Sequence, residues 1–423
     1  MSKGGYGIPL SRLSCLAMAE EEGKAWFARL QANGLYEFDE KEKRTRLLLR
    51  FPDFPIDKSF LYLAIEKAGN MLVLAPAAAS KIVFYDLEAE RAEYVELMPA
   101  VMERKWGYTG YCDFFKSYMH GDNVYFFGYE YPAILKIDVK TKQIVYLVDW
   151  VKEVEQRIKK ISAGLGYVSD YVVTGDCVWA LCECANAVLC LNLRTDEIRI
   201  VDICSDLEIC CGICFDGNFW VTGYNENANK LLKYDCSFAL EKEIEICSAQ
   251  KDGDKYSISL QDNFWDIYPI LDLGDRLLLF SFYPRHVYEF DKTLHEIRLL
   301  SVFEELMEVW DEQFHDMGIL APRKRGNFVR FITGNDFLWN EYDFVHDTIT
   351  RYEVRDEADE ALLQEKSKFM AGRIFREDMR VGNLGYKMTL LRFLEHIAYV
   401  PKAEADNIDK DHSVGARIHE KNS

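Results

Sequence analysis

Three stretches of the sequence share one layout. Residues 121–144 read GDNVYFFGYEYPAILKIDVKTKQI, residues 175–198 read GDCVWALCECANAVLCLNLRTDEI, and residues 274–297 read GDRLLLFSFYPRHVYEFDKTLHEI. Each begins with Gly-Asp, continues with an apolar and aromatic run, and crosses a short polar stretch. Each then reaches a second run that ends in Asp or Asn before a charged turn. Internal similarity of this kind is typical of repeat proteins.

Four looser copies complete a set of seven. They begin at Gly23, Gly69, Gly217 and Gly326. In all seven copies the Asp or Asn that ends the second run follows the glycine by 16 to 18 residues, whereas successive glycines are 42 to 57 residues apart. The constant part lies within each copy and the variable part lies between copies, as expected when loops absorb insertions.

Each copy predicts four short strands. Val, Ile, Tyr, Phe and Trp favour strands, and Gly-Asp or Gly-Asn permits the positive φ of a tight hairpin. A further apolar stretch precedes each glycine, at 13–17, 60–65, 114–119, 171–173, 209–213, 268–273 and, weakly, 317–321. Four antiparallel strands repeated about every 50 residues predict a blade of a β-propeller. We therefore expect an all-β, seven-bladed β-propeller over residues 1–356, with a six-bladed ring capped by the last copy as the alternative.

On these repeats the chain resembles the β-propeller superfamily, over about four-fifths of its 423 residues. It lacks the Gly-His and Trp-Asp signature of WD40 repeats and the paired glycines of kelch repeats. Its blades are most similar to the loose "Gly-Asp-x-Val-Trp … Ile-Asp-x-x-Thr" blades of lactonase-like, quinoprotein-like and streptogramin-lyase-like propellers. The resemblance implies a ring of blades, but these families include both enzymes and binding proteins, so it does not imply one activity.

The two faces of such a ring are expected to differ. The first-to-second and third-to-fourth hairpins lie on one face, and their turns at 39–44 and 86–91 are short and charged. The second-to-third loops and the links between blades lie on the other face, which receives every long insertion. Two insertions predict helices, at 149–166 and 302–315. Long insertions on one face of a rigid scaffold are where a site is expected.

Beyond the repeats, the sequence predicts a helical extension and a tail. Residues 357–400 contain strong helix formers and an apolar stripe, and a Gly-rich break at 382–385 separates two helical segments. Residues 401–423 are polar and are expected to be disordered. The extension either packs on the propeller or recruits a partner.

Aromatic, amide and cationic side chains on the loop-rich face are the candidate ligand contacts. Such groups stack on and hydrogen-bond polar ligands such as sugars or peptides. The alternative is that the aromatics wedge between blades. The candidates are Trp106, Tyr131, Tyr224, Asn225, Tyr283, Arg285 and His286.

No motif in the chain identifies a reaction. There is no phosphate-binding glycine loop, no nucleophile elbow, and no metal-ligand spacing among the eight histidines. Eight cysteines fall within 177–214, including Cys182-x-Cys184 and Cys211-x-x-Cys214. Buried cysteine behaves as a small hydrophobe, so we expect core packing rather than a metal site, with redox sensing as a further alternative. We expect no metal and no cofactor.

Charge and targeting signals restrict partners and location. With 51 Lys and Arg against 70 Asp and Glu, the formal net charge is −19, which disfavours nucleic acid and anionic membranes. The N-terminus has no apolar signal segment, and twelve cysteines without an export signal indicate a reducing, cytoplasmic location.

Two functions are therefore expected from the sequence. The first is a non-catalytic binding or scaffold propeller for a protein, peptide or carbohydrate ligand. The alternative is a lyase or hydrolase of a sugar, lactone or peptide, with Tyr283, Arg285 and His286 as first candidates at the channel mouth.

Overall fold

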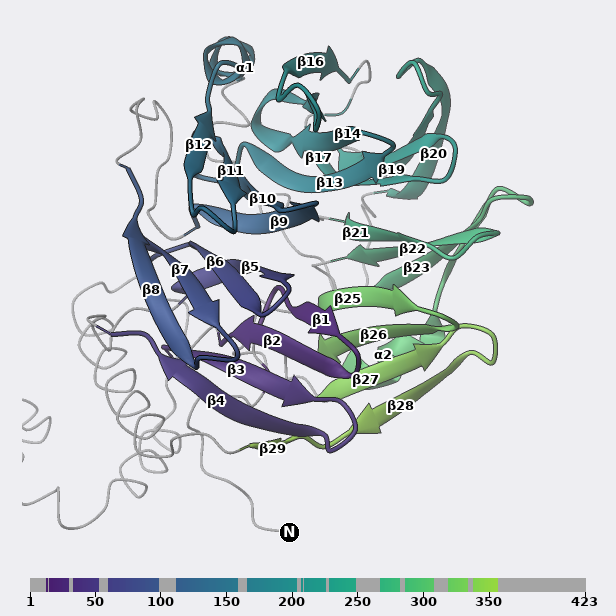
Figure 1. The fold of residues 1–423 in the computed structure, drawn as a ribbon. Helices are drawn as coiled ribbons and strands as arrows, with labels where there is room; N and C mark the ends of the chain where they lie inside the picture. Colours follow the sequence, from purple (N-terminus) through teal and green to yellow (C-terminus); the bar gives the residue numbers. More distant parts are fainter. Residues whose placement is uncertain are drawn as a thin grey trace, which may run out of the picture. The chain divides into compact units, whose positions relative to one another are not determined.

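In the computed structural model, the described residues form seven sheets of four antiparallel strands each, which correspond one by one to the seven sequence copies, and one further short strand joins the first sheet (Figure 1). The structure describes residues 13–356, except 14, 30–32, 53–59, 99–111, 159–165, 204–206, 208, 226–227, 249–266, 282–285, 308–318 and 334–337. The all-β, seven-bladed β-propeller expected from the sequence is confirmed. The helical extension at 357–400 and the tail at 401–423 lie outside the described residues.

The first four blades run from the N-terminal side of the chain. Their strands are β1 (Ala19–Glu21), β2 (Lys24–Ala28), β3 (Gly34–Asp39) and β4 (Arg44–Arg50); β5 (Tyr62–Ala68), β6 (Met71–Pro76), β7 (Lys81–Asp86) and β8 (Arg91–Glu96); β9 (Phe114–His120), β10 (Asn123–Gly128), β11 (Ile134–Asp138) and β12 (Ile144–Leu147); β13 (Val168–Thr174), β14 (Cys177–Cys182), β15 (Ala187–Asn192) and β16 (Ile198–Asp202).

The last three blades follow the same order. Their strands are β17 (Ile209–Phe215), β18 (Phe219–Tyr224), β19 (Ala228–Tyr234) and β20 (Leu240–Ser248); β21 (Ile267–Asp272), β22 (Arg276–Ser281), β23 (Val287–Asp291) and β24 (Glu296–Leu299); β25 (Ile319–Arg325), β26 (Phe328–Thr333), β27 (Trp339–Asp343) and β28 (Thr348–Tyr352). A two-residue strand, β29 (Arg355–Asp356), joins the outer edge of blade 1.

The repeated residues have a local backbone reason. The seven repeat glycines all have positive φ, between 56° and 108°, and an added Cβ would meet no atom within 4 Å. Conformation therefore requires glycine there, rather than lack of space. The Asp or Asn 16 to 18 residues later accepts backbone N–H groups in the outer hairpin, as Asp86 Oδ1 does from Glu88 N at 2.9 Å and Ala89 N at 3.0 Å. The same side-chain-to-backbone bond recurs in the other six blades.

The aromatic content of the sequence fills the blade interfaces. Seven large apolar clusters occur in the described part of the chain, one between each pair of neighbouring blades, including one between blade 7 and blade 1. The innermost strands of neighbouring blades contact each other, as β5 does β9 and β17 does β21, so the first strand of every blade lines the channel.

Polar contacts close the ring between blade 7 and blade 1. The Glu40 carboxylate accepts from Arg330 Nη1 at 2.7 Å and Arg325 Nη1 at 3.1 Å, and its side chain is buried. β29 pairs in parallel with the start of β4, and Arg355 N donates to Lys43 O at 2.7 Å. Burial lowers the pKa of Lys43, whose ammonium lies 4.1 Å from the centroid of the Tyr352 ring.

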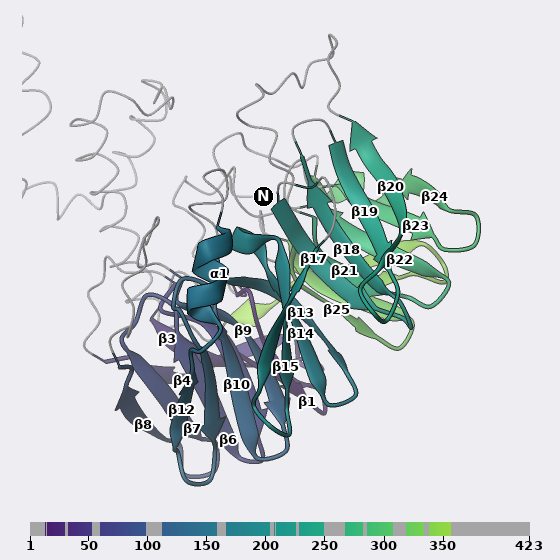
Figure 2. The same cartoon turned by 90° about the horizontal axis from the view of Figure 1, so that it is seen from above.

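Two short helices occur where the sequence predicts them. They are α1 (Val151–Arg157) and α2 (Ser301–Met307), and both lie in links between blades. Val151 and Val154 of α1 are buried between blades 3 and 4, on the apolar stripe that predicted the helix. Figure 2 shows α1 at the opposite end of the strands from the hairpin turns. No helix among the described residues is long and apolar enough to cross a membrane.

One strand prediction is wrong. The sequence placed the first strand of blade 1 at 13–17, whereas β1 begins at Ala19 and includes Glu20 and Glu21. Two adjacent glutamates obscure a strand pattern in the sequence. The structure tolerates them because Arg323 and Lys67 pair with them.

Candidate functional site

A β-bulge recurs in the innermost strands near the loop-rich face, which holds the second-to-third loops and the links. The register between first and second strands shifts by at least one residue in six of the seven blades, blades 2 to 7. A bulge inserts an unpaired residue and turns its side chain out of the regular alternation. The single inserted residues in blades 2 to 5 are Leu63, Phe115, Ser169 and Cys211.

In blades 2 and 3 the inserted residues, Leu63 and Phe115, belong to an apolar cluster at the channel mouth, which also includes a residue of blade 1. Leu63 and Ala77 are its buried members, and partly buried side chains from all three blades pack against them. Tyr129 packs its ring edge against Phe115, with centroids 5.3 Å apart. We call this set the apolar mouth; its members are Leu16, Phe60, Leu63, Ala77, Cys112, Phe115 and Tyr129.

The apolar mouth contains a strained residue. Phe60 has a φ of +56°, which is rare for a bulky side chain. Its carbonyl accepts from Ala78 N at 3.1 Å, and the neighbouring Leu61 carbonyl accepts from Ala77 N at 2.8 Å. Such backbone outliers persist only when their surroundings hold them, and they concentrate at functional sites.

Below the apolar mouth, the same strands carry a charged layer. We define it as Glu20, Glu21, Glu66, Lys67, Lys116, Asp170 and Arg323. Lys116 Nζ lies 2.8 Å from Asp170 Oδ1, and Ile213 N donates to Asp170 Oδ2 at 3.2 Å. The buried Asp170 carboxylate therefore ties blade 4 to blades 3 and 5.

Arg323 makes the corresponding link between blades 7 and 1. Its Nη1 lies 3.0 Å from Glu20 Oε1 and donates to Met18 O at 2.8 Å. A bulge at 321–322, where Ala321 has a φ of +46°, precedes Arg323 on β25. On the opposite side of β1, Lys67 pairs with Glu21.

Glu66 is the exception in the charged layer. It has no ion-pair partner among the described residues, and its side chain is half-buried. Burial raises the pKa of Glu66, while the nearby Ser117 hydroxyl, which donates to Ile65 O at 3.4 Å, and the charge of Arg323 act in the opposite direction. Glu66 in turn helps to raise the pKa of Tyr171, whose hydroxyl donates to Ser117 O.

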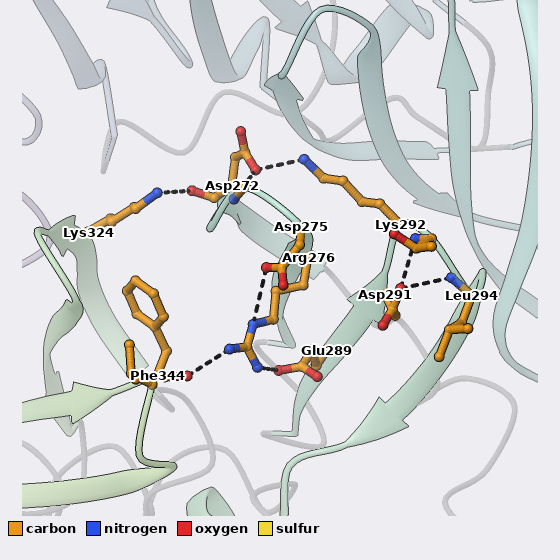
Figure 3. A network of polar contacts seen from close by, with 12 residues as sticks. Asp272, Asp275, Arg276, Glu289, Asp291, Lys292, Leu294, Lys324 and Phe344 are labelled. Atoms are coloured by element: carbon orange, nitrogen blue, oxygen red, sulfur yellow. Dashed lines mark hydrogen bonds and ion pairs between the residues drawn. The ribbon is translucent and has the colours of Figure 1, made fainter.

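The turn face of blades 5 to 7 carries a separate ionic network (Figure 3). Lys292 Nζ lies between Asp216 of blade 5, at 2.5 Å, and Asp272 of blade 6, at 2.7 Å. Arg276 donates to Glu289 at 2.7 Å and to the Phe344 carbonyl of blade 7 at 2.8 Å. These contacts join neighbouring blades, and each charged group in them is paired. We therefore assign this network a structural role in holding the ring together.

The sequence candidates come from several blades. Trp106, Tyr283 and Arg285 lie outside the described residues. The others all lie at or next to second-to-third loops: Tyr131 in blade 3, Tyr224 and Asn225 in blade 5, and His286 in blade 6. Because the second-to-third loops lie on the loop-rich face, these four residues lie on that face, as expected from the sequence.

Their described contacts are mainly structural. Tyr131 is buried, packs on Phe114 with centroids 5.1 Å apart, and donates to Met98 O at 2.8 Å. Tyr224 is buried beside Ile209 and Cys211. Asn225 Oδ1 accepts from Ala228 N at 3.1 Å and shapes its loop, and the His286 ring packs edge-on against Tyr288 at 5.9 Å. Ligand contact by these four residues stays a prediction.

The cysteines of 177–214 that the structure describes are free thiols, most of them buried. Cys182 Sγ and Cys184 Sγ lie 3.8 Å apart, and burial raises the pKa of Cys182 well above its ordinary value. Across the described part of the chain, no three His, Cys, Asp or Glu side chains are placed to hold a metal ion.

The sequence analysis missed both the apolar mouth and the charged layer. The signal for the layer was present, because first strands are otherwise apolar and yet contain Glu66, Lys116, Asp170 and Arg323. The inserted residues of the bulges share no residue type, so their sequence carries no common signal.

Comparison with known proteins supports the fold but does not indicate a function. No protein-family model and no curated protein matches the chain. Among solved structures, a catalytically inactive variant of virginiamycin B lyase from Staphylococcus aureus, solved with quinupristin, is 13% identical, with a TM-score of 0.52 over 79% of this chain and 96% of that one. The β-propeller domain of Cps50 (Swd1) from Myceliophthora thermophila is 12% identical, with a TM-score of 0.50 over 79% and 97%.

A third similar structure is the extracellular domain of a proposed one-component system of B. thetaiotaomicron. It is 11% identical, with a TM-score of 0.51, and this chain covers only 39% of its length. The similarities to virginiamycin B lyase and to the Swd1 propeller domain support the β-propeller fold. At these identities they do not transfer an activity, a ligand or a cellular location.

Proposed function

We propose that the protein is a non-catalytic binding propeller that receives a protein, peptide or carbohydrate ligand at the apolar mouth. The observation that carries the proposal is the position of Phe60, Phe115 and Tyr129, which are partly exposed at the channel end of blades 1 to 3. Aromatic side chains above a small number of polar groups are typical of ligand sites.

The state of the charged groups supports binding over catalysis. Lys116, Lys67 and Arg323 are each paired with a carboxylate from another blade. Groups held in this way stabilise the ring and are not free to act as nucleophile or base. The net charge of −19 favours neutral or cationic partners and disfavours nucleic acid and anionic membranes.

The test is recovery of a partner on matched variants. Full-length protein carrying Phe115→Ala and Tyr129→Ala is compared with wild type in affinity purification from native lysate, followed by mass spectrometry and glycan analysis. Leu294→Ala is the control, because Leu294 is exposed on the turn face. We expect a stoichiometric ligand with wild type and the control, and its loss with the double variant. Equal recovery with all three proteins would reject the apolar mouth as the binding site.

Glu66 favours one alternative, an enzyme that uses a channel carboxyl as a general acid. A raised pKa increases the fraction of the carboxyl that carries a proton, and a protonated carboxyl can donate to a leaving group. If this alternative holds, wild type turns over a member of a panel of lactones, glycosides and peptides, and Glu66→Gln does not. No turnover by wild type across the panel counts against it.

A further inference from the structure

The described cations of the innermost strands are already engaged. Lys67, Lys116 and Arg323 pair with Glu21, Asp170 and Glu20, and near the turn face Lys324 donates to Asp272 O at 2.9 Å and Arg325 contacts Glu40. An anionic ligand in the channel would have to break one of these contacts. The charge pattern therefore disfavours an anion as the ligand.

The acids show one exception to this pairing. Glu20, Glu21, Asp170 and Asp272 each lie within ion-pair distance of a lysine or arginine, whereas Glu66 does not pair with any described residue. Among the described residues of the innermost strands, Glu66 is thus the one carboxyl without an ion-pair partner.

Glu66 is placed in the channel by its neighbours. The Ser117 hydroxyl on β9 of blade 3 donates to the carbonyl of the adjacent residue, Ile65, at 3.4 Å, so β9 lies beside β5 at this level. The charge of Arg323 on β25 of blade 7 acts on Glu66, and Glu66 acts on Tyr171 on β13 of blade 4. Glu66 lies on β5, the innermost strand of blade 2, which lines the channel. Arg323 is itself neutralised by Glu20 at 3.0 Å.

Leu63 of the apolar mouth precedes Glu66 by three residues on β5. Phe115 precedes Ser117 by two residues on β9, a separation of about 7 Å along a strand. That separation suits a short alkyl chain running from the mouth to Glu66. The Phe115 ring already has the Lys116 ammonium 5.3 Å from its centroid, so a cation–π contact of this kind occurs at the mouth.

We propose that the channel binds a primary ammonium group on an apolar stem, with the stem against Phe60, Phe115 and Tyr129 and the ammonium on Glu66. The stem is either a lysine side chain of a peptide or a free alkylamine. This inference rests on the proposed function and names its ligand class.

Binding of the ammonium releases a proton. The Glu66 carboxyl is protonated to a larger extent than an ordinary glutamate because burial raises its pKa. The ammonium stabilises the carboxylate, so the carboxyl O–H proton passes to buffer while the ammonium keeps its own three. Ser117, Tyr171 and Arg323 are the groups that surround Glu66 in this step, and none of them changes charge.

Calorimetric titration of the full-length protein tests the proposal. The probes are n-butylammonium, with 1-butanol as its neutral analogue, and a lysine-containing peptide, with its Nε-acetylated form. Each is titrated at pH 6 in two buffers that differ in ionisation enthalpy, so the proton released is measured directly. We expect that n-butylammonium, the lysine-containing peptide, or both bind with release of a proton. The neutral analogue of each amine that binds, 1-butanol or the Nε-acetylated peptide, should bind at least tenfold more weakly.

Two variants identify the carboxyl. Glu66→Gln removes the charge and the titrating proton, and we expect at least tenfold weaker binding without proton release. Glu88→Gln, in the exposed outer hairpin of the same blade, is the control and binds as wild type does. Circular dichroism and thermal unfolding confirm that both variants fold. The peptide and butylammonium arms distinguish a lysine side chain from a free amine.

Three results would overturn the inference: no amine binds at millimolar concentration, the neutral analogues bind equally well, or Glu66→Gln binds as wild type does. These results leave the proposed function standing if the Phe115 and Tyr129 double variant still loses a co-purified ligand. If that variant retains the ligand, the proposed function fails independently of the cation.

Discussion

The apolar mouth and the charged layer meet on the inner strands β5 and β9, where Leu63 and Phe115 lie three residues and one residue before Glu66 and Lys116, and the side chains of the two sets differ in exposure and pairing. In the charged layer, Asp170 and Arg323 each form an ion pair and a hydrogen bond with neighbouring blades, and these contacts stabilise the ring. In the apolar mouth, Phe60, Phe115 and Tyr129 keep part of their surface exposed. The difference shows that ion pairs between blades stabilise the ring at the charged layer, whereas the aromatic side chains of the apolar mouth remain available to contact a ligand.

The sharpest test of this comparison is a pair of neighbouring phenylalanines on β9. Phe114 is fully buried between blades 2 and 3, and Phe115 is the half-exposed inserted residue of the bulge. We expect Phe114→Ala to lower the free energy of unfolding by about 3–5 kcal/mol and Phe115→Ala by about 1 kcal/mol. Urea unfolding measures both. Equal losses would show that the mouth is part of the core.

The next largest effect is expected at the carboxylate that ties three blades together. Asp170→Ala leaves Lys116 and the Ile213 N–H without their partner, and we expect a loss of about 3 kcal/mol. Asp122→Ala is the control, since its ion pair with Lys140 is exposed on the turn face and contributes at most about 1 kcal/mol. A loss for Asp170→Ala no larger than the control's would contradict the structural role of the layer.

The smallest effect is expected at the bulge of blade 4. Ser169 is buried, and its Oγ has no hydrogen-bond partner among the described residues. An unsatisfied buried hydroxyl costs free energy, so Ser169→Ala should raise the free energy of unfolding by about 1 kcal/mol. Thermal and urea unfolding both report this change, and a destabilised variant would mean that the hydroxyl is satisfied.

The fold was predictable because the repeat is required locally. Each repeat glycine has a positive φ, and each hairpin Asp or Asn accepts backbone N–H groups, so both positions stay constant in sequence. A further repeated feature, a positive φ in each outer hairpin, could not be recognised from the sequence because it is a backbone conformation and not a residue type. Every outer hairpin holds a non-glycine residue with positive φ, such as Glu90, Lys142 and His295, and these residues share no type.

The candidate site was less predictable because it depends on contacts between blades. Leu63, Phe115 and Ser169 are brought to one level by strand register, which no local pattern encodes. The first strand of blade 1 was misplaced for a related reason, since Glu20 and Glu21 are acceptable in a strand only with Arg323 and Lys67 beside them.

The predicted ligand residues show that sequence does not determine which loop aromatics are exposed. Tyr131 and Tyr224 were chosen as loop aromatics, and both are buried in the described structure. Sequence can place an aromatic residue on a loop, but only packing decides which part of its ring is exposed. Phe115, within a predicted strand, is exposed because a bulge turns it out.

The central claim is that Glu66, alone among the acids of the described innermost strands, lacks an ion-pair partner, and the pH dependence of stability tests it most directly. Because the pKa of Glu66 is higher in the folded protein than in the unfolded chain, the folded state binds more protons, and this carboxyl costs stability as pH rises. The free energy of unfolding of wild type and Glu66→Gln is measured by urea unfolding from pH 4 to pH 8. We predict that the variant is the more stable protein at pH 8 and that the difference shrinks toward pH 4. A difference that is independent of pH, or a variant that is less stable at pH 8, would contradict the account.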